Sequence, residues 1–338
     1  MPMSSPRLSI CIATRNRGDV LAPTLDALLA QVGPGVEIVV VDGASTDNTG
    51  EVVRTRAERN ASLKYFPQVS NSGIDGDFDK AIVLAQGEYC WLMSDDDLPL
   101  DGAVQRVLGL CQQDLAAVIV DAEVYSADYS IKLLNQRLRF TGERRYASDE
   151  MDRLLADCGD CLSFIGALVI RRAIWLARER QAYFGTEFIH VGVLFQAPLP
   201  GEVLALGEPM LRIRYGVGNW ARRAFEVWMF KWPNLIWSFT QRSEPARSTV
   251  TARYPWQNPV KLLLYRAKGL YSWDAFRRLV MPVKRPFLEK IPALFTAVLP
   301  GLVAYLLVKF MLDLFPHRFQ GARWELTLSP YSPKRRLS

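Results

Sequence analysis

The stretch Tyr89–Met93 (YCWLM), followed directly by the residues SDDD at 94–97, decides the fold. Five apolar or aromatic residues without polar alternation are typical of a strand buried on both faces of a sheet. Three successive carboxylates at its end are unfavourable together, because like charges raise one another's pKa. The stretch therefore predicts a central strand that carries an acidic cluster into a polar site. The plainer interpretation is a solvated acidic turn that caps the next helix.

Strands alternate with helices before this stretch. Apolar, β-rich runs predict strands over residues 7–14, 36–41 and 62–66. Apolar residues at helical spacing predict helices over 19–31, 47–59 and 76–86. Farther along, strands are predicted over 116–125 and 162–171, the second running into a helix over 172–180. This alternation predicts the α/β class, with a mainly parallel, Rossmann-like sheet flanked by helices.

Unusual polar clusters follow three of these strands. They are Thr14-Arg15-Asn16, the loop from Asp42 to Asp47, and the run from Asp95 to Asp97. Ligands of parallel α/β sheets bind beyond the carboxyl ends of the strands. A hard cation such as Mg²⁺ commonly binds one or two carboxylates plus the phosphates of a substrate. The clusters therefore predict a site for a metal-bound diphosphate.

The order of these motifs resembles that of family 2 glycosyltransferases with the GT-A fold. The resemblance rests on residues 10–16 (ICIATRN), 41–47 (VDGASTD) and 85–97 (AQGEYCWLMSDDD). The stretch GIDGDFDKAI at 73–82 and the long C-terminal tail particularly resemble the abequosyltransferase-like members, which are implicated in bacterial O-antigen (lipopolysaccharide) assembly. The resemblance implies a nucleotide-diphosphate sugar as donor and a polyprenyl-diphosphate-linked saccharide as acceptor. It also implies work at the cytoplasmic face of the inner membrane.

The resemblance also implies roles for single residues. Thr14 and Arg15 are expected to line the pocket for the base and ribose, and Asp42 is expected to accept a hydrogen bond from the nucleobase. Asp95 is expected to contact the ribose. Together with Asp97 it is expected to hold a Mg²⁺ or Mn²⁺ ion that bridges the diphosphate.

Two further donor-site residues are less closely defined by the resemblance. Asp96 is the middle residue of the acidic motif. The family often has Ala-Arg-Asn where this chain has Asp77-Phe78-Asp79, so the usual arginine is missing. Lys80, the next residue, is expected to replace it in holding the sugar or the diphosphate.

The catalytic base is expected within Gly185–His190 (GTEFIH). Inverting members of the family use a carboxylate at this place to deprotonate the acceptor hydroxyl. His190 falls about where that base would lie, and Glu187 precedes it by one helical turn. A neutral imidazole is a sound base near pH 7. His190 could equally bind the metal or an acceptor phosphate, or pack in the core.

The charge of the chain is divided unevenly along its length. Residues 1–210 hold 19 Lys and Arg against 29 Asp and Glu, whereas residues 211–338 hold 22 against 6. Seven of the nine Trp also follow residue 210. Basic charge mixed with Trp suits an anionic lipid surface, although a solvated basic face has the same composition. No nucleic-acid-binding module is recognisable, so no nucleic acid partner is expected.

We therefore predict a nucleotide-sugar-binding catalytic domain over residues 1–219 and a helical, membrane-associated region over 220–338. The longest apolar stretch is 291–308, at the lower limit for crossing a bilayer and interrupted by Pro292, Pro300 and Gly301. It could span the membrane, lie in its interface, or form a buried helix. The N-terminal residues lack the apolar run of a secretory signal, so the N-terminus is expected in the cytosol.

Two other functions fit parts of this pattern. One is a non-catalytic protein that binds nucleotide sugars or polyanions. The other is a sugar nucleotidyltransferase, which also uses a parallel sheet and acidic metal ligands. The second would normally carry a Gly-rich phosphate loop near its N-terminus, and ICIATRNRGD at 10–19 is not such a loop.

Overall fold

The computed structural model describes residues 5–216, 219–314 and 320–333. Their contacts divide the chain into two compact units. Unit 1 comprises residues 1–125, 134–214 and 239–250, and unit 2 comprises 126–133, 215–238 and 251–338. The main division thus falls after residue 214, and the segment 239–250 belongs with unit 1.

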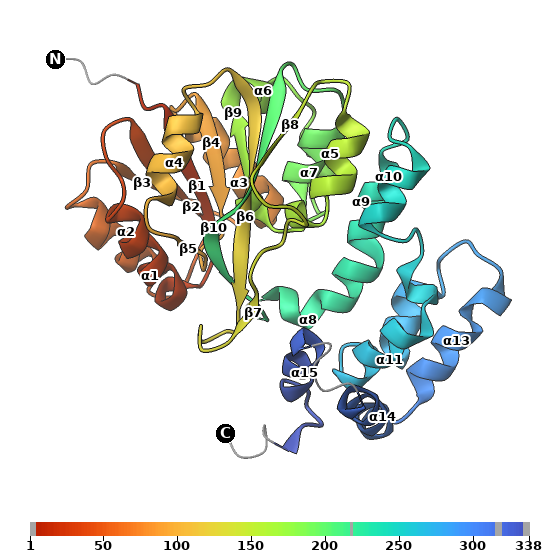
Figure 1. Cartoon of the computed structure of the whole chain (residues 1–338). Coiled ribbons are helices and arrows are strands. Elements are labelled where there is room, and N and C mark those ends of the chain that lie inside the picture. The colour runs from red at the N-terminus through yellow and green to blue at the C-terminus, as the bar shows by residue number, and fades with distance from the viewer. Residues whose placement is uncertain (1–4, 217–218, 315–319, 334–338) are drawn as a thin grey trace. The chain divides into compact units, whose positions relative to one another are not determined.

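Unit 1 is built on a single mixed sheet (Figure 1). The strands are β1 (Leu8–Thr14), β2 (Val36–Asp42), β3 (Leu63–Pro67), β4 (Tyr89–Met93), β5 (Leu98–Pro99), β6 (Leu115–Tyr125), β7 (Lys132–Leu134), β8 (Glu143–Tyr146), β9 (Leu168–Arg171) and β10 (Glu202–Arg214). The main path runs β3-β2-β1-β4-β9-β6-β10-β5, and β8 pairs with β10. Neighbours pair in parallel from β3 to β4 and between β6 and β10. On this path β9 and the short β5 are antiparallel to their neighbours, and β8 pairs antiparallel with β10 beside the path. The sheet is therefore mixed, and the α/β class that the sequence predicts is confirmed.

The helices of unit 1 follow the strands in alternation. They are α1 (Gly18–Leu29), α2 (Thr49–Ala57), α3 (Gly73–Leu84), α4 (Ala103–Leu110), α5 (Met151–Cys158), α6 (Arg172–Leu176), α7 (Ile189–Phe195) and α10 (Glu244–Val250). α3 packs on β1 and β2, α2 beside β3, and α5 beside β8 (Figure 1). β1, β2 and β4 are buried over their whole length, as their apolar runs predict.

The structure differs from the sequence prediction at two strands. Residues 162–167 were predicted as strand, but two 3₁₀ turns, Cys161–Ser163 and Ile165–Ala167, precede β9. There the Trp91 indole donates to the Gly166 carbonyl over 2.9 Å, which takes that carbonyl out of strand pairing. The long strand β10 was not predicted, because Gly207 and Pro209 interrupt its apolar pattern. The register against β6 shifts between Leu206 and Pro209, and this irregularity lets the strand continue.

Unit 2 is helical, as the composition of the C-terminal part predicts. Its helices are α8 (Asn219–Glu226), α9 (Trp232–Ser238), α11 (Pro259–Ala267), α12 (Trp273–Ala275), α13 (Phe287–Val298), α14 (Gly301–Asp313) and α15 (Gln320–Thr327). Aromatic rings fill its larger core. Phe225 stacks on Tyr271 with 4.4 Å between the ring centroids, and it meets Tyr265 edge-on with 5.4 Å between the centroids. Such pairs add to the stability that burial itself provides.

The apolar stretch 291–308 forms parts of two helices. α13 ends at Val298 and α14 begins at Gly301, with an angle of 99° between them. Pro300 has no N–H to continue the first helix, which accounts for the break. Within the described residues, no single helix is long and apolar enough to cross a bilayer; only this bent pair reaches the required length and composition.

Candidate active site

The carboxyl ends of β2, β1 and β4 lie side by side and bring three predicted polar residues together. Thr14 is the register partner of Asp42 across the parallel pair of β1 and β2. The Thr14 hydroxyl in turn donates to Oδ2 of Asp95 over 2.7 Å. All three side chains are buried. The structure thus joins the predicted nucleotide-binding loops and the acidic motif into one site, through Thr14.

Arg17 is the cation of this site, and the sequence did not identify it. Its Nε donates to Oδ1 of Asp95 over 2.8 Å, and its Nη2 to Oδ2 of Asp96 over 2.5 Å. Burial raises the pKa of Asp95 to about 6, although the positive charge of Arg17 acts against this rise. Arg17 is the residue just before α1. Its backbone N–H donates to the Thr49 hydroxyl over 3.0 Å.

Asp97 is the most enclosed carboxyl group of the acidic motif. Burial raises its pKa well above the usual range, and the neighbouring charges of Asp96 and Asp95 raise it further. A glycine makes room for it: a Cβ at Gly166 would lie 3.2 Å from Oδ2 of Asp97. The positive charge of Arg214, at the end of β10, acts to lower the pKa of Asp97. The Nε of Arg214 donates to the Asp96 carbonyl over 3.2 Å.

The donor chemistry of Asp95 and Asp97 fits a hard divalent cation. Both offer oxygen ligands, and a cation would offset the crowding of negative charge that burial makes costly. Among the described residues no group of three or more His, Cys, Asp or Glu is arranged around one point for a metal. Two carboxylates suffice for an ion that takes its other ligands from phosphates and water.

The loop after β2 forms a second part of the site around Asp42. Its Oδ2 accepts from the Tyr65 hydroxyl over 2.7 Å, and its Oδ1 from the Ser45 backbone N–H over 2.8 Å. Gly43 allows Asp77 to approach, since a Cβ there would lie 2.5 Å from Oδ2 of Asp77. Burial raises the pKa of Asp77. Two carboxyl groups and a phenol therefore meet where the resemblance places the nucleobase.

The predicted residues Arg15 and Lys80 have different surroundings. Arg15 is exposed, and its charge acts to lower the pKa of Asp77. Lys80 is also exposed, and in the part of the chain that the structure describes it makes no hydrogen bond or ion pair. Its neighbour Asp79 binds Arg180 at 2.7 Å and the Trp175 indole at 2.8 Å, which is a structural role.

The loop that carries Glu187 is held by Asp75, at the start of α3. The Asp75 carboxylate accepts from the backbone N–H groups of Gly185 (2.8 Å), Glu187 (2.8 Å) and Ile189 (3.1 Å). Glu187 is buried and has a φ of +70°, which is a left-handed conformation that costs a non-glycine residue energy. Strain of this kind persists where surrounding contacts impose it, and it is concentrated at functional sites.

His190 lies in the core, on the buried α7. Its side chain is fully enclosed, and Nε2 lies 2.7 Å from the Leu162 carbonyl. Burial lowers its pKa to about 4, so the ring is neutral at neutral pH. Within the described residues its Nδ1 has no hydrogen-bond partner. These surroundings are those of a packing residue, one of the alternatives that the sequence left open.

Sequence reasoning missed Arg17, Tyr65, Asp75 and Arg214. Arg17 directly follows the Thr14-Arg15-Asn16 cluster, and this position next to predicted site residues could have identified it. Asp75 belongs to the run of alternating acidic residues at 75–79, whose pattern does not reveal which carboxylate turns inward. Tyr65 and Arg214 lie on strands with no polar motif, and only the pairing of the strands brings them to the site.

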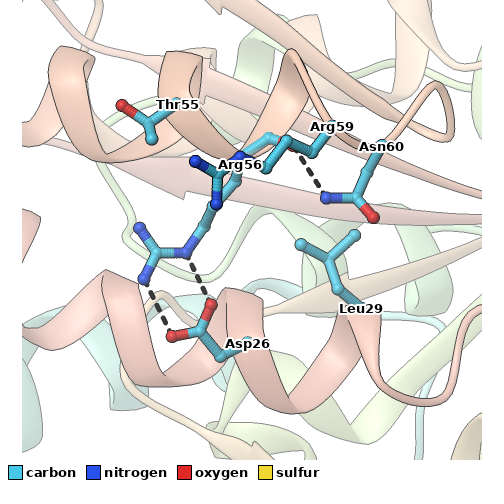
Figure 2. A pocket seen from close by; sticks show the side chains of 6 residues that line it. All are labelled: Asp26, Leu29, Thr55, Arg56, Arg59 and Asn60. Carbon is cyan, nitrogen blue, oxygen red and sulfur yellow. Dashed lines mark hydrogen bonds and ion pairs between the residues drawn. The ribbon is translucent and has the colours of Figure 1, made fainter.

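A separate pocket lies between α1 and α2, away from these residues. Figure 2 shows its lining, in which Arg56 binds Asp26 through two hydrogen bonds of 2.7 and 2.8 Å. The Asn60 amide donates to the Arg56 carbonyl over 2.8 Å. None of the predicted site residues lines it, and its ion pair is a surface contact that ties α1 to α2.

Parallel strands that end in a shared acidic and polar site define an α/β fold of the nucleotide-binding kind. The family model described as "Glycosyl transferase family 2" matches residues 9–175, which include every strand end of the site except that of β10. Residues 9–175 therefore form a glycosyltransferase family 2 domain, and unit 1 has the GT-A fold.

Two curated relatives place the chain among bacterial glycosyltransferases. It is 27% identical over 221 residues to the abequosyltransferase RfbV of Salmonella typhimurium, covering 61% of this chain and 66% of the relative. It is 30% identical over 114 residues to the GalNAc(5)-diNAcBac-PP-undecaprenol beta-1,3-glucosyltransferase of Campylobacter jejuni, covering 33% of this chain and 37% of that enzyme. The chain thus matches less than two thirds of the length of either relative.

Two solved structures share the fold at low identity. TarS residues 1–349 of S. aureus, in complex with UDP-GlcNAc, aligns with a TM-score of 0.53 and 16% identity over 88% of this chain and 81% of that chain. The mannosyltransferase PcManGT of Pyrobaculum calidifontis, in complex with GDP-Man and Mn²⁺, aligns with a TM-score of 0.51 and 17% identity over 98% of this chain and 86% of that chain.

Proposed function

We propose that this chain transfers a sugar from a nucleoside-diphosphate donor to a hydroxyl group of a lipid-linked saccharide, in the assembly of a bacterial surface polysaccharide. The observation that carries the proposal is the contact series Asp42–Thr14–Asp95 at the ends of β2, β1 and β4, beside the buried Asp97. It gives a single site in which one end can bind a nucleobase and the other a metal-bound diphosphate.

The nucleoside would bind at Asp42, Thr14 and Arg15. Asp42 retains accepting capacity for a base N–H beyond the bonds from Tyr65 and Ser45, since each carboxylate oxygen can accept two. Asp95 and Asp96 would face the ribose and the diphosphate. Arg17 takes the cationic role that the sequence assigned to Lys80, because it already lies within 2.8 Å of the acidic motif.

A Mg²⁺ or Mn²⁺ ion would be held by Asp97 and Asp95. When bound, such an ion neutralises the charge that develops on the departing nucleoside diphosphate. Arg17 and Arg214 add fixed positive charge near the same carboxylates, and preorganised charge of this kind stabilises a transition state without further rearrangement. The Mn²⁺ and GDP-Man complex of PcManGT supports the assignment by fold alone.

Glu187 is our candidate for the base that deprotonates the acceptor hydroxyl. Its backbone is fixed by Asp75 in a left-handed conformation just before α7, within the stretch 185–190 in which the resemblance implies a base. A fixed backbone limits the directions in which the Glu187 side chain can point. His190, the other candidate, is enclosed by the core and hydrogen-bonded to Leu162, which favours a packing role.

The acceptor is assigned by similarity and composition. The Campylobacter relative is named for an undecaprenol-linked acceptor, and the relative from Salmonella is an abequosyltransferase. The excess of basic residues after residue 210 suits the anionic surface of the cytoplasmic leaflet, where such a lipid-linked acceptor would be presented. We therefore place the protein at the cytoplasmic face of the inner membrane.

A donor-cleavage screen tests the proposal. UDP-, GDP-, CDP- and dTDP-sugars are incubated with the protein and Mn²⁺ or Mg²⁺, and the release of nucleoside diphosphate is measured. We expect cleavage of one donor class, its abolition by EDTA, and a loss of about 10²–10³-fold or more in Asp97→Ala. Binding without cleavage would instead indicate a non-catalytic binder. Formation of nucleoside triphosphate from donor and pyrophosphate would indicate a nucleotidyltransferase, and either result overturns the proposal.

A further inference from the structure

The helices α13 and α14 expose large apolar side chains. Six of them define what we call the hairpin face, and each is between 46% and 76% exposed. They are Leu288, Phe295, Leu302, Leu306, Leu307 and Phe310. Single exposed apolar residues are ordinary in soluble proteins, but several large ones on each of two consecutive helices point to an interaction surface.

The pattern of α14 shows that this exposure is built into the sequence. Gly301, Ala304, Tyr305 and Val308 are buried, at the spacing of one helical face. On a surface helix of a soluble protein the opposite face is polar. Here the residues between the buried ones are apolar as well, with Lys309 and Asp313 as the charged residues of the helix. A helix that is apolar on both faces needs a second apolar environment besides its own core.

The geometry of the pair suits the surface of a bilayer better than a crossing. α13 and α14 have 12 and 13 residues, so each is about 18–20 Å long, well short of the roughly 30 Å of a hydrocarbon core. The angle of 99° keeps them from forming one straight span, and Figure 1 shows α13 from the side and α14 almost end-on. α11 packs against both helices, and the exposed residues of the hairpin face are not among those that the cores of unit 2 bury.

The charges around the pair select an anionic surface. Residues 251–314 hold ten Lys and Arg against three Asp and Glu. Arg277, Arg278 and Lys284 are exposed in the segment that leads into α13. Exposed Trp273 lies in the same segment. Basic side chains and a Trp beside an apolar face are the pattern of helices that lie in the headgroup region of anionic membranes.

We propose that the hairpin face inserts into one leaflet of an anionic bilayer, with α13 and α14 both lying along the membrane surface. The inference deepens the proposed function, because it names the element that would bring the chain to a lipid-linked acceptor. Insertion itself needs neither donor nor acceptor, so the two proposals can fail separately.

Vesicle flotation with the full chain tests the insertion. The vesicles contain equal parts of phosphatidylglycerol and phosphatidylcholine, or phosphatidylcholine alone. We expect wild-type protein to float with the anionic vesicles and more weakly with the neutral ones. The double variant Leu306→Glu/Phe310→Glu should lose about tenfold or more in partitioning, because two charges would enter the apolar layer.

A charge-matched control separates this effect from added negative charge. Val69→Glu/Val83→Glu places the same charges on exposed apolar positions of unit 1 and should float nearly as well as the wild type. Both double variants alter exposed side chains, and circular dichroism and thermal unfolding check that they fold. If Leu306→Glu/Phe310→Glu floats like its control, the hairpin face does not bind the bilayer.

The arrangement in the membrane is tested by labelling. The five native cysteines are buried, so the variants Lys284→Cys and Asp313→Cys each add one accessible thiol. A membrane-impermeant maleimide added outside sealed vesicles should label both positions if the helices lie along one surface. Protection of one position would show a crossing.

Sedimentation without lipid tests whether a second copy of the chain covers the hairpin face instead. A second copy would be indicated if the wild type is a dimer, if Leu306→Glu/Phe310→Glu is not, and if the wild type does not float with vesicles. Either result overturns the inference.

Donor cleavage distinguishes this inference from the proposed function. Leu306→Glu/Phe310→Glu should cleave the nucleotide sugar at the wild-type rate when no lipid acceptor is present. Loss of flotation with intact cleavage supports the hairpin face. If the protein cleaves no donor but its flotation still depends on the hairpin face, the proposed function is wrong and the membrane-binding inference is supported.

Discussion

Nε of Arg17 lies 2.8 Å from Oδ1 of Asp95, and the same guanidinium group reaches Asp96. Arg17 precedes the first helix, whereas the two carboxylates follow the fourth strand, so the contact joins segments far apart in the chain. The side chains are mostly buried, with Arg17 21% exposed and Asp95 7% exposed. Removing one partner of such a pair is costly, because it leaves a buried charge without compensation.

Arg17→Gln should therefore destabilise the protein in metal-free buffer, by about 2 kcal/mol in the free energy of unfolding. Mn²⁺ should restore more stability to the variant than to the wild type, since a divalent ion would then replace the missing positive charge. Urea unfolding with and without Mn²⁺ measures both effects. Arg56→Gln, which breaks the exposed pair with Asp26 shown in Figure 2, serves as control and should cost less than about 1 kcal/mol with no response to Mn²⁺.

Asp75→Asn should slow donor transfer more than it weakens folding. The Asn side chain would turn an amide toward backbone N–H groups that now donate to a carboxylate, so the loop around Glu187 would lose its conformation. We expect kcat to fall by about tenfold or more with a smaller change in donor KM. Asp79→Asn on the same helix breaks the pair with Arg180 and should lower the melting temperature with little change in kcat. Equal kinetic effects of the two variants would refute a role for Asp75 in positioning Glu187.

His190 should make the protein less stable in acid. Its pKa in the folded protein is about 4, below the ordinary value of 6.5. Between these values the unfolded chain binds a proton that the folded protein does not, so stability is lost as the pH falls from about 6.5 toward 4. The full effect is on the order of 3 kcal/mol. Urea unfolding at pH 7 and pH 5 should show a smaller pH dependence in His190→Gln than in the wild type. An unchanged pH dependence would contradict the buried, neutral ring.

Gly166→Ala should disturb Asp97 without touching the acidic motif itself. The added methyl group would lie 2.8 Å from side-chain carbons of Leu211 and Phe164 and 3.2 Å from the carboxylate of Asp97. We expect a loss of about 1–3 kcal/mol in stability from overpacking, together with reduced donor cleavage. The control is Gly109→Ala in α4, where an added Cβ meets nothing within 4 Å and where Ala should stabilise the helix slightly. Full activity in Gly166→Ala would show that Asp97 tolerates displacement.

The parallel half of the sheet could be predicted because its signals are local. The strands at 7–14, 36–41 and 89–93 are short apolar runs, and such runs can be satisfied only by burial on both faces. β10 could not be predicted in this way. It carries Gly207 and Pro209 inside a strand, and its pairing with β6 tolerates them through a shift in register. Residues 162–167 were predicted as strand, because composition alone does not show that the Gly166 carbonyl accepts a hydrogen bond from the Trp91 indole.

The candidate site follows the same distinction. Thr14, Asp42 and Asp95 were predicted because each directly follows a buried strand, and strands of one parallel sheet end at one edge. Arg17, Asp75 and Arg214 act from a helix cap, a first helical turn and the end of a distant strand. Arg17 adjoins the Thr14-Arg15-Asn16 cluster, but its partners, like those of Asp75 and Arg214, are distant along the chain, and the sequence does not show which residues they contact.

The amino-acid sequence by itself determined the α/β class, the order of the polar loops and the helical, basic character of the second half, because these depend on periodicity and composition over a few residues. Only the tertiary structure decided that Arg17 pairs with Asp95 and Asp96, that His190 is enclosed, and that α13 and α14 turn an apolar face outward. Each of these features depends on contacts between residues that are far apart in the sequence, and local side-chain preferences do not specify such contacts.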